Sequence, residues 1–133
     1  MKGRILHLFS GKSTLGNIRV DYRFGNIKSD VFEYLEECSR VFKTIIIDPP
    51  YNQKFADKYQ EVGNTPKQFI IFANTEGTTR LFNLIREKIN PDIIIMKSWN
   101  YYIPKGYKLK KGFLCYAGGY RKPTILLVLE RIN

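Results

Sequence analysis

The stretch that decides the fold is Thr44-Ile45-Ile46-Ile47-Asp48-Pro49-Pro50-Tyr51. Its first four residues are β-branched and have no polar break, which is typical of a strand buried on both faces. The two prolines cannot continue the strand and make the following turn rigid. In open α/β sheets, ligands bind at the carboxyl ends of such strands. We therefore expect Asp48 and Tyr51 to lie at a ligand-binding edge of an α/β sheet.

Five further segments have the short, apolar character of strands and alternate with helical patterns, which is typical of an α/β domain. These strand candidates are residues 4–9, 17–21, 92–97, 112–116 and 124–130. Counting 44–47 as the third, we expect the first, second and fourth strands to run parallel through crossover connections. The last two flank a Gly118-Gly119 turn and are expected to form an antiparallel hairpin. The 133 residues suit one domain.

Helical patterns separate the strand candidates. Asp30 and Glu33 form a capping-box pattern ahead of apolar residues at helical spacing, which predicts a helix over about residues 30–40. Residues 79–89 carry apolar side chains on one broad face and stop before Pro91, so they predict a second helix. Residues 69–73 are ambiguous between a buried strand and a helix that begins near Pro66, and we favour the helix.

The charge of the chain favours a polyanionic partner. Lys and Arg number 22 against 12 Asp and Glu, a formal charge of +10. Such an excess suits DNA, RNA or an anionic membrane surface, and nucleic acid is the partner we expect. The apolar run at residues 5–9 is too short for a signal peptide or a membrane span. A cytoplasmic location follows, in the host cytoplasm if the source is viral, with no membrane partner.

Few residues could build a metal centre or a histidine-based catalytic triad. His7 is the only histidine, and it lies in an apolar run. Cys38 and Cys115 lie far apart in apolar segments, so we expect reduced, buried thiols and no metal site. The chemistry must therefore use other groups.

Asp48-Pro49-Pro50-Tyr51 carries a set of groups suited to an amine on an aromatic ring. The prolines remove two backbone donors, which leaves the loop carbonyls free to accept hydrogen bonds. The Asp48 carboxylate adds a second acceptor, so an amine can be held while its lone pair faces an incoming methyl group. Tyr51 offers a flat face on which a flipped base can stack.

With this motif, extended by Asn52, the chain resembles the class I S-adenosylmethionine-dependent amino-methyltransferases, especially the adenine-N6 DNA type. The resemblance implies a three-layer Rossmann-like sheet, S-adenosylmethionine as cofactor, and catalytic residues Asp48, Pro49, Pro50 and Tyr51. It implies methylation of an exocyclic nucleobase amine, with adenine N6 in DNA favoured and RNA still open. Some ribosomal RNA guanine-N2 methyltransferases share the motif, so the motif does not name the base.

The same resemblance implies a cofactor site in the amino-terminal half. Phe9 and Gly11 match the start of the methionine-binding loop, although the link at residues 12–16 is shorter than the family's first crossover. Asp21 matches the acid that binds both ribose hydroxyls, unless it is an ordinary turn aspartate. Asp30 matches the acid that meets the adenine amino group, with Val31 beside the ring, unless Asp30 is only a helix N-cap.

The carboxyl-terminal third is basic and aromatic. Between Ile93 and Leu129 there are seven basic residues and no acidic one. Such a mixture can bind phosphates by charge and unpaired bases by stacking. The alternative is a solvated basic loop whose aromatic residues complete the core. The nucleic-acid-binding candidates are Lys97, Trp99, Tyr102, Lys105, Lys108, Lys110, Lys111, Arg121 and Lys122.

Two other functions compete with methylation of a nucleobase, and a third, nucleoside triphosphate binding, is discarded. The short link at 12–16 favours a non-catalytic nucleic-acid-binding module on a degenerate methyltransferase fold. Methylation of a protein amide is less favoured, because that group usually has Asn where this chain has Asp48. Gly11-Lys12-Ser13-Thr14 looks like the end of a Walker A loop, but Leu6 stands where its first glycine is required. No target-recognition domain is evident, so we expect sequence specificity to come from a partner subunit, a second copy or a small surface near residues 99–107, or to be slight.

Overall fold

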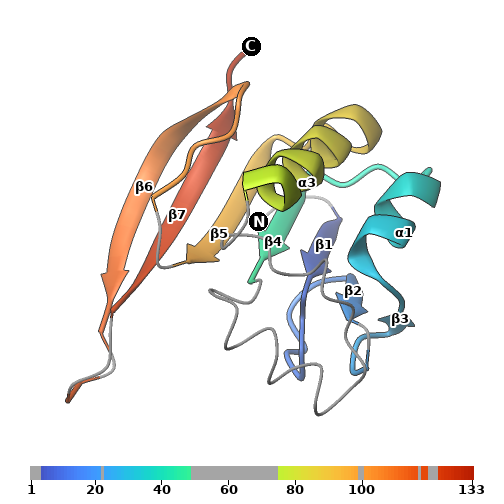
Figure 1. Cartoon of the computed structure of the whole chain (residues 1–133), viewed down its shortest axis with the longest axis horizontal. Coiled ribbons are helices and arrows are strands. Elements are labelled where there is room, and N and C mark those ends of the chain that lie inside the picture. Colours follow the sequence, from blue (N-terminus) through green and yellow to red (C-terminus); the bar gives the residue numbers. More distant parts are fainter. Residues whose placement is uncertain (1–3, 22, 49–74, 99–100, 117, 120–122) are drawn as a thin grey trace.

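The computed structural model describes residues 4–21, 23–48, 75–98, 101–116, 118–119 and 123–133. In these residues seven strands form one mixed sheet, with two helices beside it (Figure 1). The helices are α1 (Val31–Glu37) and α3 (Thr75–Lys88). The strands are β1 (Ile5–Leu8), β2 (Ile18–Asp21), β3 (Ile27–Lys28), β4 (Thr44–Ile47), β5 (Ile93–Ser98), β6 (Tyr107–Cys115) and β7 (Thr124–Arg131).

The strands lie in the order β3-β2-β1-β4-β5-β7-β6. The strands from β3 to β5 in this order run parallel, whereas β7 is antiparallel to both β5 and β6. The predictions of an α/β fold, of a mostly parallel sheet and of a carboxyl-terminal antiparallel hairpin are therefore confirmed. Gly118 and Gly119, both with positive φ, lie in the turn of that hairpin.

Alternate residues of the central strands build the core on one face of the sheet. The register aligns Leu6 with Ile45 and Ile45 with Ile94, and it aligns the residues two positions further along in the same way. These side chains form a single buried cluster with apolar residues of both helices, so α1 and α3 lie on the same face. We call this the helix face and the opposite surface the far face of the sheet.

Element boundaries differ from the predictions where tertiary contacts outweigh local pattern. Strand β3 was not predicted, because two residues leave no periodic signal. Strand β6 begins at Tyr107 rather than at residue 112, since pairing with β7 holds its lysine-rich first half extended. Helix α1 ends at Glu37 rather than near 40, and α3 begins at Thr75 rather than at 79. The helix predicted over 69–73 lies outside the described residues.

The first crossover is shortened, as expected. Residues 9–17 join the parallel strands β1 and β2 without a helix, although such connections usually need a dozen or more residues. The buried ring of His7 closes this link, with its Nδ1 atom 2.9 Å from the carbonyl oxygen of Leu15. A Cβ on Gly16 would lie 3.1 Å from the His7 Cβ, so the link packs tightly against β1.

In the described part of the chain, no helix is long and apolar enough to cross a membrane. The two cysteines, Cys38 and Cys115, are free thiols. Each is half-buried, whereas the sequence predicted full burial.

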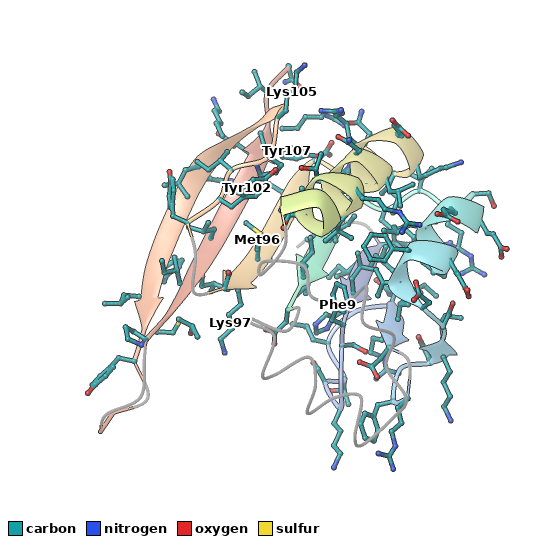
Figure 2. The ribbon with its side chains drawn as sticks, in the orientation of Figure 1. Phe9, Met96, Lys97, Tyr102, Lys105 and Tyr107 are labelled. Atoms are coloured by element: carbon teal, nitrogen blue, oxygen red, sulfur yellow. The ribbon has the colours of Figure 1, made fainter. Side chains whose placement is uncertain are left out.

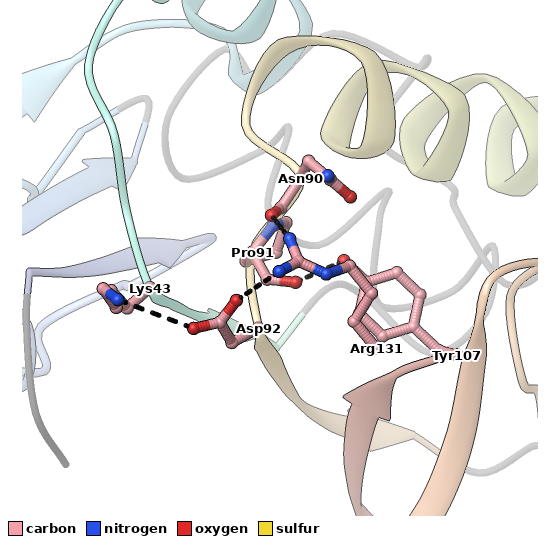
Figure 3. A network of polar contacts seen from close by, with 6 residues as sticks. All are labelled: Lys43, Asn90, Pro91, Asp92, Tyr107 and Arg131. Carbon is pink, nitrogen blue, oxygen red and sulfur yellow. Dashed lines mark hydrogen bonds and ion pairs between the residues drawn. The ribbon is translucent and has the colours of Figure 1, made fainter. Parts of the chain in front are cut away.

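A polar network ties the turn before β5 to the carboxyl-terminal strands (Figure 3). The Arg131 guanidinium lies 2.7 Å from the Asp92 carboxylate and also donates to the carbonyl oxygen of Asn90. Lys43 approaches the other Asp92 oxygen at 3.8 Å. The buried Tyr107 hydroxyl donates to the Pro91 carbonyl oxygen at 2.6 Å. The network lies at the end of β5 away from Asp48, so we assign it to stability.

Tyr107 should make the fold sensitive to alkaline pH. Burial raises the pKa of this phenol from 10.0 to about 12. Between these two values the unfolded chain loses the proton and the folded chain keeps it, so stability falls as pH rises through that window. Tyr107→Phe should lower stability by about 1 kcal/mol at pH 7 through the lost hydrogen bond. The stability of this variant should, however, decline less steeply above pH 10 than that of the wild type. Urea denaturation of both proteins at pH 7 and above pH 10 measures this. Equal declines would contradict the assignment, because Tyr34, whose pKa is also raised to about 12, is common to both proteins.

Candidate functional site

Asp48 lies at the carboxyl end of the central strand β4. From β1 the chain moves outward in the sheet through β2 and β3. It then returns to β4, on the other side of β1, and continues from β4 to β5. Sheet order therefore reverses between β1 and β4, which is where open α/β sheets bind ligands. Asp48 is exposed there, and its backbone N–H donates to the carbonyl oxygen of Leu8 at 3.4 Å. The other predicted catalytic residues, Pro49, Pro50 and Tyr51, lie outside the described residues.

The loop after β1 lies beside Asp48 and is sharply turned. Phe9 and Gly11 have φ values of 58° and 52°, which is the left-handed region. A Cβ at Gly11 would meet no atom within 4 Å, so the glycine faces open space. The Gly11 N–H donates to Asp21 Oδ2 at 2.9 Å, which joins the end of β1 to the end of β2. The structure thus brings together three of the predicted cofactor residues.

The Asp21 carboxylate is already engaged by the backbone. Its Oδ1 accepts from the N–H groups of Arg23 at 2.9 Å and Phe24 at 3.1 Å, in addition to the Gly11 bond on Oδ2. A carboxylate has about four acceptor positions, so these bonds occupy most of them. Asp21 therefore acts as a turn aspartate, and the bonds from described residues leave about one of its acceptor positions.

Asp30 is the N-cap of α1. Its Oδ1 accepts from the N–H groups of Phe32 at 2.8 Å and Glu33 at 3.2 Å, and the residue is 3% exposed. The N-cap interpretation of Asp30 is therefore confirmed, and it explains the position without a ligand. Val31 is 1% exposed within the core cluster, so its side chain offers almost no free surface to an adenine ring in this conformation.

The basic candidates divide between the end of β5, the segment after it, and β6. Figure 2 shows Met96 directed toward α3 and Lys97 directed away from it. Lys105 lies in the segment before β6, and Lys108, Lys110 and Lys111 lie on β6; all four are exposed. Trp99, Arg121 and Lys122 lie outside the described residues.

Tyr102 does not belong with the exposed candidates. It is half-buried, and its ring centroid lies 5.2 Å from that of Phe82 on α3. Tyr107 is also buried. For these two residues, the alternative that the aromatics complete the core is correct.

An exposed aromatic residue that the sequence did not single out lies beside Asp21. The Phe24 ring is 47% exposed, with Lys12 Nζ 5.3 Å and Arg23 Cζ 5.2 Å from its centroid. These distances suit cation–π contacts. Only the folded loop brings Lys12 across to Phe24, so local pattern carried no signal for the cluster.

In the described residues, no group of three His, Cys, Asp or Glu side chains is placed to hold a metal ion. The candidate site therefore consists of the exposed Asp48 carboxylate at the reversal of sheet order and, beside it, the loop in which Gly11 donates to the Asp21 carboxylate. No protein-family model matches the chain, and no curated protein matches it either.

Proposed function

We propose that the protein transfers a methyl group from S-adenosylmethionine to an exocyclic amine of a nucleobase, with adenine N6 in DNA as the substrate. In this proposal Asp48 and the Pro49 carbonyl accept hydrogen bonds from the amine, and Tyr51 stacks on the base. Phe9, Gly11 and Asp21 face the cofactor, while the buried Asp30 and Val31 hold the start of α1 beside this site. The protein would act in the cytoplasm, with DNA as its main partner.

The observation that carries the proposal is the position of Asp48 at the reversal of sheet order, next to the loop that Gly11 and Asp21 close. The order β3-β2-β1-β4-β5 follows that of doubly wound dinucleotide-binding sheets. This agreement supports the Rossmann-like assignment, in which a cofactor would lie over β1 with its reactive end toward β4.

The residues fit such a cofactor in part. Gly11 leaves room for close approach, and Asp21 retains about one acceptor position for a ribose hydroxyl. S-adenosylmethionine, when bound, supplies an electrophilic methyl group on sulfur. Asp48 would orient the substrate amine so that its lone pair faces that methyl group. The new C–N bond would form as the methyl–sulfur bond breaks, which would leave a neutral thioether as the leaving group, and an amine proton would go to solvent. Catalysis in this scheme is mainly positioning.

One set of observations favours a second function, a non-catalytic nucleic-acid-binding module. The link between β1 and β2 has no helix, and backbone N–H groups occupy much of the Asp21 carboxylate. The Asp30 carboxylate is engaged as well, because it caps α1. A fold that had lost its cofactor would keep such structural roles. The +10 charge would then serve binding alone.

Calorimetric titration with S-adenosylmethionine separates the two functions. We expect a Kd of about 1 μM to 1 mM, the range of KM values common for enzyme substrates, and transfer of labelled methyl groups to DNA. Asp21→Ala should weaken cofactor binding by about tenfold, close to 1.4 kcal/mol, through loss of the ribose acceptor and of the Gly11 bond. If the wild-type protein neither binds the cofactor nor methylates DNA or RNA, the binding-module function replaces our proposal.

A control must separate loop collapse from loss of the carboxylate. The Asn26 side chain accepts from the Arg19 N–H at 2.7 Å and donates to the Asn17 carbonyl, so it supports the same region without facing the loop glycine. Asn26→Ala should change cofactor affinity by less than about threefold. Equal losses in both variants would remove Asp21 from the cofactor site.

A further inference from the structure

The far face of β5, β7 and β6 combines basic side chains with an exposed aromatic ring. Residues paired across neighbouring strands project to the same face of a sheet, and the register gives three rows on this face. They are Lys97–Leu126–Phe113, Ile95–Val128–Lys111 and Ile93–Glu130–Lys108. The ion pair of Lys108 with Glu130, at 3.4 Å, agrees with this assignment.

This part of the far face is open to solvent. Phe113 is 50% exposed, Lys108 and Lys111 are exposed, and the apolar residues of β5 and β7 in these rows are half-buried. By contrast, the far-face residues His7 and Ile46 of β1 and β4 are buried. The accessible surface therefore begins at β5 and extends across β7 to β6. Strand β6 is the edge strand of the sheet (Figure 1).

The charge of these rows selects the partner. Three lysines face one carboxylate, Glu130, which Lys108 already neutralises. A second copy of the chain docked by the same face would bring the lysines of both copies together, which is unfavourable. A polyanion with unpaired bases matches both the net positive charge and the exposed ring.

The rows also lead to the candidate site. Ile47 pairs with Met96, so the next residues along these parallel strands, Asp48 and Lys97, are neighbours at the two strand ends. From there the first row continues through Leu126 to Phe113. With strands about 4.8 Å apart, Phe113 lies about 14 Å from the strand that carries Asp48.

We propose that the far face of β5, β7 and β6 is the docking surface for single-stranded nucleic acid, with Lys97, Lys108 and Lys111 binding phosphates and Phe113 stacking on a base. The inference rests on the proposed function, because the nucleic acid bound at this surface is the one whose target base lies at Asp48. It divides the basic residues by their place in the register, because Lys110 lies at the bulge between Leu109 and Lys111 and is outside the rows.

Neighbouring residues on β6 supply matched variants. Lys111 and its neighbour Lys110 are both exposed, but only Lys111 lies in the far-face rows. Phe113 and its neighbour Leu114 are also both exposed, and Leu114 pairs with Ile125 on the helix face. In each pair the same kind of side chain is removed from the same strand. The two variants of a pair differ in whether the lost side chain belongs to the far-face rows.

The test measures binding of a fluorescent single-stranded DNA oligonucleotide by anisotropy between about 50 and 200 mM salt. Lys111→Ala should weaken binding about threefold or more and lower the salt slope by about 0.7, whereas Lys110→Ala should have a clearly smaller effect. Phe113→Ala should weaken binding about tenfold, with Leu114→Ala nearly unchanged and Phe113→Tyr retaining affinity. Thermal melting of every variant checks the fold.

Equal effects within both pairs would overturn the docking surface, as would a larger effect of Lys110 and Leu114. This readout needs no methyl transfer. If the wild type methylates DNA while the pairs do not differ, only the docking surface fails. If the pairs differ but no cofactor binds, methyl transfer fails and the docking surface stands.

Discussion

Asp48→Ala is expected to lower methyl transfer by a factor of at least about 10², while the affinity for S-adenosylmethionine changes by less than about threefold. The carboxylate is exposed at the sheet reversal, where it can meet the substrate amine. Without it the amine loses one of two acceptors, and its lone pair is no longer held toward the methyl group. Single-turnover transfer of labelled methyl to DNA, with calorimetry for the cofactor, measures the two effects separately.

Two variants make the result interpretable. The backbone N–H of Asp48 bonds Leu8 whatever the side chain, so Asp48→Ala should keep the fold, which circular dichroism can verify. Asp48→Asn keeps one carbonyl acceptor and should retain more activity than the alanine variant. A folded Asp48→Ala protein that transfers methyl at more than about half the wild-type rate, a loss below 0.5 kcal/mol, would exclude Asp48 from the chemistry.

Gly25→Ala is expected to destabilise the protein by about 3 kcal/mol. A Cβ at this position would lie 2.1 Å from the Arg19 carbonyl oxygen and 2.9 Å from the Asp21 nitrogen. Both contacts are backbone atoms of β2, so no flexible side chain can move aside. The chain must shift around the Asp21 turn, which should lower the melting temperature by about 10 °C and weaken cofactor binding as well.

Gly112→Ala is the matched control. Its Cβ would meet the Leu127 Cδ2 atom at 3.7 Å and the Leu109 Cδ1 atom at 4.0 Å, both ordinary contacts, and Gly112 lies in a paired strand. We expect a change within about 0.5 kcal/mol. If the two alanine variants melt at the same temperature, then the close approach of Gly25 to β2 is not a constraint on the fold.

Much of the architecture follows from local sequence. The run from Thr44 to Ile47 has no polar break, so it predicted a buried strand with the bounds that the structure gives. Residues 112–116 and 124–130 flank two glycines, which predicted the hairpin. The position of Asp48 at the carboxyl end of a central strand could also be predicted, because it depends only on where the apolar run stops.

Other features depend on contacts between segments distant in sequence. The first half of β6 is lysine-rich, and pairing with β7 keeps it in the sheet. The two-residue strand β3 exists because β2 is beside it. In both cases the hydrogen bonds of a neighbouring strand outweigh a weak or absent local pattern.

The sequence by itself determined the strand before Asp48, the motif at its end, the hairpin and the basic excess, since each depends on residues adjacent in the chain. Only the tertiary structure decided that the Asp21 carboxylate accepts from Gly11, that Tyr102 packs on Phe82, and that Lys111 shares a face with Lys97. The reason is physical. Residue type and spacing set the polarity of a segment, whereas the face and the hydrogen-bond partners of a side chain are set by strand register and by the segments that fold against it.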